Sequence, residues 1–108
     1  MSQVKVYHKT KKGCIYKCKS CQQWHVLYNT IQFNLSHNEL VSFNRQINIE
    51  VNCFCDDNDS YDMRSLCFNS EKQGGLILNF TKQEFLELEY LLGGALIIHN
   101  TENIIFNA

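Results

Sequence analysis

The chain has 108 residues, of which 44% are hydrophobic and none is proline, so we expect one packed domain and exclude a disordered or proline-rich chain. Its start has no apolar segment of signal-peptide length, and the apolar run 91–98 is too short to span a bilayer. These features predict a soluble, cytoplasmic protein without a membrane partner, whose six cysteines are reduced thiols or metal ligands rather than disulfides.

The net charge of −1 hides an uneven distribution. Six lysines precede residue 20, the first acidic residue is Glu39, and the rest of the chain carries four basic and eleven acidic residues. The basic end could bind nucleic acid or an acidic partner, or it could lie against the acidic segment 56–59 of the same chain. Contact with the acidic segment of the same chain is favoured, because the lysines alternate with strand residues and this part of the chain has no arginine to bind a phosphate through two hydrogen bonds. The nucleic-acid alternative would use Lys9, Lys11, Lys12, Lys17, Lys19 and Trp24.

Short segments that alternate between apolar and polar residues fill the first third of the chain. They predict an opening strand followed by two hairpins, which would form an antiparallel sheet. The hairpin turns are expected at Lys19-Ser20 and at Asn29-Thr30. The expected strands are 4–8, 14–18, 21–25, 25–28 and 31–35.

Two segments share one apolar pattern. The segment IQFNLSHNELVSFNRQI (31–47) matches LILNFTKQEFLELEYLL (76–92) at every apolar position of the first copy. Each copy is typical of a strand that runs directly into an amphipathic helix, and a hairpin is expected upstream of each junction. The pattern indicates two β-hairpin–helix units at about 14–47 and 61–92, which a duplication or similar packing demands would explain equally well.

Both predicted helices begin with the same capping residues. Ser36 and Thr81 are placed to accept a hydrogen bond from the backbone N–H three residues on, and Glu39 and Glu84 are placed to return it. An apolar residue before each N-cap faces another at the fourth helical position, which sets the angle between strand and helix. Two capping boxes therefore locate the starts of the helices.

The helix ends and the remaining strands follow from alternation and glycine. Strict alternation in 47–54 predicts a strand directly after the first helix. Gly93 and Gly94 are expected to end the second helix, and 103–107 to form a closing strand. The sequence therefore predicts one α+β domain over 1–108, with an antiparallel sheet and both helices on one face.

The pair Cys18-x-x-Cys21 has the spacing of a zinc knuckle. In a regular hairpin, Cys14 would lie opposite His25 and Cys18 opposite Cys21. At about 3.3 Å per residue, the two pairs would be roughly 13 Å apart. Because zinc holds its ligands at about 2.0–2.3 Å, these four residues cannot share one ion. Cys18 and Cys21 would then form half of a zinc site.

Cys53 and Cys55 are the candidates to complete that site. In a strand they would extend the apolar stripe of 47–54, where buried reduced thiols are common, so a core role for them is favoured over zinc binding. A redox role for the Cys18–Cys21 pair is less favoured still. A thioredoxin-like motif opens a helix, whereas this pair lies between two strand arms.

The run C-x-x-C-x₅-L-Y-N-x-I-x-F-x-L-S-x-x-E-L-x-x-F, followed by L-I-L-N-F-T-x-x-E-F-x-x-L-x-x-L-L, resembles a family of small uncharacterised bacterial proteins, known only as a domain of unknown function. The resemblance covers roughly residues 14–96. It implies a metal-binding or structural role for Cys18 and Cys21, and it implies no reaction.

Functional motifs are otherwise scarce. The sequence has no nucleophile motif, no phosphate-binding glycine loop and no paired-carboxylate constellation. We therefore expect a non-enzymatic binding domain that acts on a protein partner, with zinc as a candidate structural cofactor. Nucleic-acid binding through the basic N-terminal hairpin is the alternative.

Overall fold

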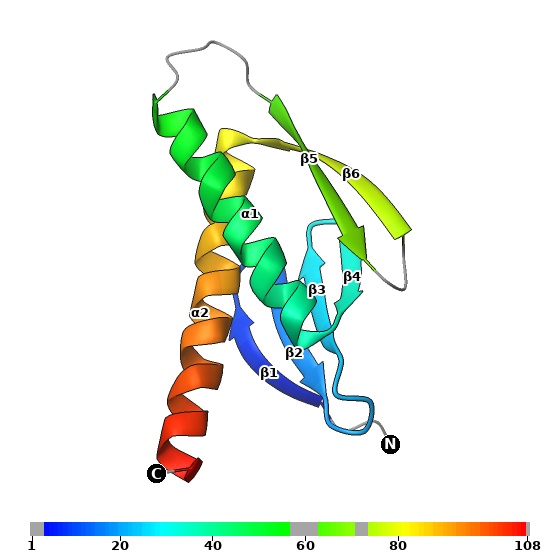
Figure 1. The fold of residues 1–108 in the computed structure, drawn as a ribbon, viewed down its shortest axis with the longest axis vertical. Helices are drawn as coiled ribbons and strands as arrows, with labels where there is room; N and C mark the ends of the chain where they lie inside the picture. The colour runs from blue at the N-terminus through cyan, green and yellow to red at the C-terminus, as the bar shows by residue number, and fades with distance from the viewer. Residues whose placement is uncertain (1–3, 57–62, 71–73, 108) are drawn as a thin grey trace.

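The computed structural model describes the backbone of residues 4–56, 63–70 and 74–107, and the side chains of 4–53, 63–70 and 74–102. The acidic segment 56–59, expected as a partner for the lysines, therefore lies outside the described side chains. The described part of the chain forms six strands and two helices (Figure 1). They are β1 (Val4–Lys9), β2 (Gly13–Cys18), β3 (Trp24–Tyr28), β4 (Ile31–Leu35), α1 (His37–Asp56), β5 (Met63–Ser70), β6 (Gly74–Thr81) and α2 (Lys82–Asn107).

The strands form two antiparallel sheets. One has four strands in the order β1-β2-β3-β4, and the other pairs β5 with β6. The α+β class is confirmed, with the strands divided between two sheets. Both expected hairpin–helix units are present, because β3 and β4 lead into α1 and β5 and β6 lead into α2 (Figure 1).

Both predicted capping boxes are confirmed. At the start of α1, the Glu39 N–H donates to Ser36 Oγ at 3.2 Å, and the Ser36 N–H donates to Glu39 Oε1 at 2.9 Å. At the start of α2, the Glu84 N–H donates to Thr81 Oγ1 at 3.2 Å, and the Thr81 N–H donates to Glu84 Oε1 at 2.9 Å. Local sequence thus sets where each hairpin turns into its helix.

Helix α1 continues to Asp56, so the strand predicted over 47–54 is wrong. Ile47 and Val51 are buried, whereas Ile49 is 54% exposed. Residues four apart lie on one face of a helix, so the spacing of Ile47 and Val51 also fits a continuation of the helix that begins at the capping box of Ser36 and Glu39. No glycine or proline in this segment ends the helix.

Helix α2 runs through both glycines to Asn107, so the predicted helix end at Gly93-Gly94 and the strand over 103–107 are also wrong. Gly94 has a packing role instead. A Cβ at this position would overlap the imidazole ring of His8 on β1. Glycine at 94 therefore lets β1 approach the helix closely.

The predicted register of the β2–β3 hairpin is wrong. Cys14 lies opposite Leu27, and Tyr16, not Cys14, lies opposite His25. The cause is a longer loop, closed by the Cys18 N–H donating to the Gln23 carbonyl oxygen at 3.0 Å. Cys21 consequently lies in the loop rather than on a strand.

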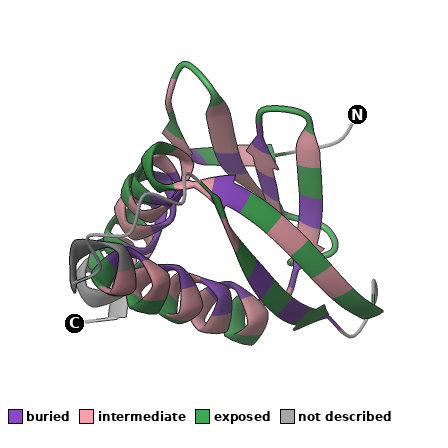
Figure 2. Ribbon diagram, turned by 90° about the horizontal axis from the view of Figure 1, so that it is seen from above, coloured by how far each residue is buried: buried purple, intermediate pink, exposed green. Residues whose placement is uncertain are grey.

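Buried side chains from one face of the four-stranded sheet, from β5 and β6 and from both helices form one core (Figure 2). Ile15, Val26 and Phe33 lie side by side across β2, β3 and β4 and are all buried. The rings of Phe43 on α1 and Phe68 on β5 have centroids 5.0 Å apart and join the smaller sheet to the same core.

Candidate functional site

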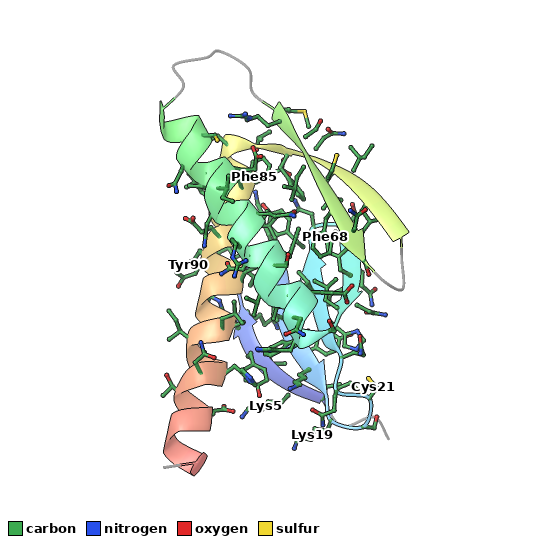
Figure 3. The ribbon with its side chains drawn as sticks, in the orientation of Figure 1. Lys5, Lys19, Cys21, Phe68, Phe85 and Tyr90 are labelled. Atoms are coloured by element: carbon green, nitrogen blue, oxygen red, sulfur yellow. The ribbon has the colours of Figure 1, made fainter. Side chains whose placement is uncertain are left out.

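Helix α2 carries apolar side chains on two opposite faces. Phe85 and Leu88 on one face are fully buried in the core. Leu86, Tyr90 and Ile97 share the other face, because they are spaced four and seven residues apart, and they are 38%, 67% and 67% exposed. Tyr90 projects from the middle of α2 (Figure 3), and the centroid of its ring lies 4.9 Å from that of the His8 ring on β1. Apolar residues on both faces are typical of a helix that packs against other protein surface on both sides.

Gly93 lies on this exposed face between Tyr90 and Ile97. A Cβ at Gly93 would have no described atom within 4 Å, so the fold does not need a glycine here. Glycine in a helix costs about 0.5–1 kcal/mol relative to alanine, and it leaves a step in the surface between two large side chains. We call Leu86, Tyr90, Gly93 and Ile97 the outer stripe of α2.

The outer stripe borders a surface pocket of about 310 Å³ between α2 and the turn that joins β1 to β2. Lys9, Lys11 and Lys12 of this turn are all exposed, and we call them the lysine turn. Apolar and basic groups therefore meet at one place on the surface. The described residues that line the pocket are Thr10, Lys11, Lys12, Glu87 and Tyr90.

Backbone hydrogen bonds and a glycine hold the lysine turn against α2. The Thr10 N–H donates to the Gly13 carbonyl oxygen at 2.8 Å, and the Asn29 N–H donates to the Lys12 carbonyl oxygen at 2.8 Å. A Cβ at Gly13 would come within 2.7 Å of the Leu91 side chain, so only glycine lets β2 start this close to the helix. The turn is thus fixed by contacts on both of its sides.

Glu87 forms the polar wall of the pocket. Its carboxylate accepts hydrogen bonds from the Tyr28 hydroxyl at 2.8 Å, from the Gln83 amide at 3.3 Å and from the Lys12 ammonium at 3.4 Å. Desolvation raises the pKa of Glu87, but these hydrogen bonds together outweigh it and lower the pKa below its ordinary value. Burial and the bond to Glu87 in turn raise the pKa of Tyr28.

The lysines of the nucleic-acid alternative fall into two groups at opposite ends of the β1–β2 hairpin. The lysine turn is one group, whereas Lys17 and Lys19 lie at the other end with Lys5, which forms an ion pair with Glu102. Four residues of strand, about 13 Å, separate Lys5 from Lys9. The basic residues therefore do not form one continuous patch.

Trp24 is 0% exposed and lies in the core. Its ring packs against Tyr7, with centroids 4.8 Å apart, and the Lys17 ammonium lies 5.3 Å from the ring centroid. A fully buried indole has no free face on which a base could stack. The assignment of Trp24 to a nucleic-acid surface is therefore corrected to a core role.

The structure keeps Cys18, the last residue of β2, close to Cys21 in the β2–β3 loop but places Cys53 elsewhere. Cys53 lies near the C-terminal end of α1, sixteen residues and about 24 Å along the helix from His37. Cys21 lies at the opposite end of the molecule (Figures 1 and 3). The side chain of Cys55 is outside the described residues. Among the described side chains, no group of three or more His, Cys, Asp or Glu residues is placed to hold a metal ion.

The Cys18 thiol is the most perturbed group in this loop. The Ser20 hydroxyl lies 3.1 Å from Cys18 Sγ, and the backbone N–H and thiol of Cys21 are also within reach. These donors, the Ser20 hydroxyl first, lower the pKa of Cys18 from 9.0 to about 7. The loop thus presents one stabilised thiolate beside a second thiol.

Residues 1–104 match the model of a protein family described as "Family of unknown function (DUF6686)". The chain belongs to this family. Neither the comparison with curated proteins nor that with solved structures gave a match. Membership in this family therefore assigns no activity to the chain.

Sequence reasoning missed the outer stripe of α2 because it ended the helix at Gly93-Gly94. If the helix is instead continued past these glycines, its period of 3.6 residues places Leu86, Tyr90 and Ile97 on one face, opposite the core. Neither described helix combines the length and the apolar character that a transmembrane span requires.

Proposed function

We propose that this protein is a binding domain that recognises an acidic segment of a partner protein carrying apolar side chains. The outer stripe of α2 and the lysine turn would form the binding surface. The observation that carries the proposal is the exposure of Tyr90 beside a pocket walled by Lys11 and Lys12. Exposed aromatic residues often anchor protein interfaces, and basic residues around them select an acidic partner.

Charge complementarity supports an acidic partner. Lys9 and Lys11 make no ion pair with any described residue, and the Lys12 side chain remains 54% exposed although its ammonium lies 3.4 Å from Glu87. Glu87 is already engaged by Tyr28 and Gln83. The turn therefore offers positive charge that acidic side chains of a partner can neutralise, while Tyr90 and Ile97 bury apolar side chains of the same segment.

A protein partner is favoured over nucleic acid by the same surface. Leu86 and Ile97 offer aliphatic contact, whereas single-stranded nucleic acid needs exposed aromatic rings along a continuous basic groove. Trp24 is buried, and the lysines lie in two separate groups. We further propose that binding, rather than turnover, is the activity, and that the cytoplasm, a reducing compartment, suits the free thiols.

The test is an NMR titration of the isotopically labelled protein with three short peptides. The first carries leucines spaced four residues apart among glutamates, the second replaces the leucines with alanine, and the third replaces the glutamates with lysine. We expect only the first peptide to shift resonances around Tyr90 and the lysine turn. Tyr90→Ala and Lys11→Glu should each weaken its binding.

Ile77→Ala is the matched control, because Ile77 is an exposed apolar residue, 71% exposed, on β6 and away from the pocket. It should leave peptide binding unchanged. Equal binding of all three peptides, or shifts on another face, would contradict the proposal. A light-scattering mass of two chains that reverts to one on Tyr90→Ala would instead assign the outer stripe to a second copy, and salt-dependent binding of an oligonucleotide at the lysine turn would assign it to nucleic acid.

A further inference from the structure

The β2–β3 loop holds Cys21 beside Cys18, the last residue of β2. The Gln22 N–H donates to the Cys18 carbonyl oxygen at 3.0 Å, and Gln22 itself adopts a left-handed conformation with φ of 60°. The Gln22 side-chain amide also donates to the Lys19 carbonyl oxygen at 3.1 Å. This compact turn brings the Cys21 thiol within hydrogen-bonding reach of Cys18 Sγ. Cys21 is exposed and Cys18 is half-buried.

The Cys18 side of this loop borders a small basic pocket of about 160 Å³. Lys5 is neutralised by Glu102. Lys17 and Lys19 supply positive charge beside the thiol, and Lys19 lies in the same loop as Cys21 (Figure 3). Such a pocket favours an anionic molecule over a neutral one. The described lining residues are Lys5, Tyr7, Lys17, Cys18, Lys19 and Gln22.

We propose that Cys18 and Cys21 form a redox-active dithiol that exchanges with small anionic disulfides, of which glutathione disulfide is the type. Cys18 is the attacking residue and Cys21 the resolving residue. This site lies in the β2–β3 loop, apart from the outer stripe of α2, so the proposal does not depend on the proposed binding function.

The exchange takes two balanced steps. The Cys18 thiolate attacks one sulfur of the disulfide RS–SR, forming a Cys18–S–SR mixed disulfide and releasing RS⁻. The Cys21 thiol then loses its proton and attacks Cys18 Sγ, which forms the Cys18–Cys21 disulfide and releases the second RS⁻. Starting from the Cys18 thiolate and the Cys21 thiol, the protein loses two electrons and one proton, and the small disulfide is reduced to two RS⁻, which take up protons from the solvent.

The expectation against redox chemistry rested on the absence of a helix N-terminus at the pair. In the structure, donors within the loop take that role, because the Ser20 hydroxyl and the Cys21 N–H stabilise the Cys18 thiolate. Zinc would require two further ligands that the described residues do not bring to this loop. An accessible thiolate beside a resolving cysteine, by contrast, is complete with the two residues present.

The thiolate population sets the expected rate. At pH 7, a thiol of pKa about 7 is half ionised, roughly 50 times more than a thiol at the ordinary value of 9.0. The lower basicity reduces the nucleophilicity of each thiolate by about eightfold. Cys18 should therefore react about sixfold faster than an exposed thiol at that ordinary value.

The test treats the reduced full-length protein with glutathione disulfide at neutral pH, followed by alkylation and peptide mass spectrometry. In the wild type, we expect a Cys18–Cys21 disulfide with the loss of two hydrogens. In Cys21→Ser, we expect glutathione to accumulate on Cys18 faster than on Cys67, an exposed cysteine on β5 that serves as the internal reference. Cys67→Ser is the matched control and should leave the loop disulfide unchanged.

A second measurement tests the pocket. The double variant Lys17→Ala/Lys19→Ala should slow the reaction of Cys18 with glutathione disulfide severalfold and leave its reaction with neutral hydroxyethyl disulfide unchanged. The difference should shrink at high salt. An equal effect on both disulfides would overturn the role of the lysines.

Three results would overturn the dithiol itself. The first is glutathione appearing on Cys67 as fast as on Cys18. The second is a wild type that keeps its mixed disulfide and never forms the loop disulfide. The third is zinc that copurifies with the wild type and is lost in Cys18→Ser, because the thiols would then be metal ligands. The first result is measured in Cys21→Ser and the second in the wild type, so neither depends on a variant that replaces Cys18.

Discussion

His8 Nδ1 donates a hydrogen bond to the backbone carbonyl oxygen of Leu91 over 2.9 Å, which ties β1 to the middle of α2. Gly94 lies directly beneath the imidazole ring of His8 and makes this approach possible. The contact explains why two consecutive glycines occur inside a helix, and it separates their roles. Gly94 serves the fold, whereas Gly93 faces open space on the outer stripe.

The two glycines should therefore respond oppositely to alanine. Gly94→Ala should lower the free energy of unfolding by about 1–3 kcal/mol, because the added methyl group overlaps the His8 ring. Gly93→Ala should raise it by about 0.5–1 kcal/mol, because it meets no described atom and restricts the unfolded chain. Urea denaturation of both variants measures the difference, and shifts of the same sign would refute the assignment.

The capping boxes should contribute to stability separately. Ser36→Ala and Thr81→Ala each remove the acceptor for one backbone N–H and should each cost about 1 kcal/mol. Thr81→Ser keeps the hydroxyl and should retain most of the stability. Because the caps are on different helices, the double alanine variant should show nearly additive loss by urea denaturation. A loss confined to one helix would contradict two equivalent boxes.

The Tyr28–Glu87 hydrogen bond should matter for both stability and charge. Tyr28→Phe removes the hydroxyl that donates to the carboxylate at 2.8 Å and should cost about 1.5 kcal/mol or more. The pKa of Glu87 should rise in this variant, because one of the donors that lowers it is gone. Carboxyl ¹³C shifts followed through a pH titration give the pKa. An unchanged Glu87 pKa would show that Lys12 and Gln83 hold the carboxylate alone.

His99 should make the fold sensitive to mild acid. Burial lowers its pKa below the ordinary value of 6.5, and the charges of Lys17 and His37 lower it further, while Glu102 opposes this. The unfolded chain then takes up a proton at a pH where folded His99 stays neutral. Stability from this group is therefore fully present above pH 6.5 and is lost as the pH falls toward the lower folded pKa.

Unfolding measured by urea at about pH 7.5 and pH 5.5 tests this linkage. The wild type should lose more stability between the two values than His99→Gln, which cannot titrate. The comparison with the variant is necessary because other groups, including Glu102 with its lowered pKa, also contribute to acid sensitivity. Equal losses in the two proteins would contradict a lowered pKa of His99 in the folded state.

The elements that local sequence specifies were predictable. The capping residues Ser36 and Thr81 marked both helix starts, and the turn at Asn29-Thr30 placed the β3–β4 hairpin correctly. Such features depend on contacts between residues close in the chain. The α+β class followed from them.

The elements that tertiary contacts specify were not predictable from the pattern alone. The spacing of two residues between Ile47, Ile49 and Val51 fits a strand, but the spacing of four between Ile47 and Val51 also fits a helix. The structure has the helix, in which Ile47 and Val51 pack into the core and Ile49 is exposed. Gly94 had the local signature of a helix end, yet its reason is a contact with His8, some 86 residues earlier in the chain.

The candidate site was only partly visible in the sequence. The lysines and the Cys18–Cys21 pair stood out as charge and spacing, but the pocket at Tyr90 forms only when the lysine turn folds onto α2. The distance between Cys53 and Cys21 likewise depends on α1 continuing to Asp56, whereas the alternation of apolar and polar residues in 47–54 predicted a strand there. Local patterns supplied the chemical groups, and the packing of β1 and β2 against α2 decided which of them meet.

The most direct test of the proposed binding surface is a double-mutant cycle between Tyr90 and one leucine of the acidic peptide. Calorimetry would give the dissociation constants for wild type and Tyr90→Ala, each with the leucine peptide and with its alanine variant. We predict a coupling energy of about 0.5–1.5 kcal/mol for Tyr90 and a value near zero for Ile77→Ala in the same cycle. Equal coupling at the two positions, or no coupling at Tyr90, would show that the outer stripe of α2 does not bind the partner.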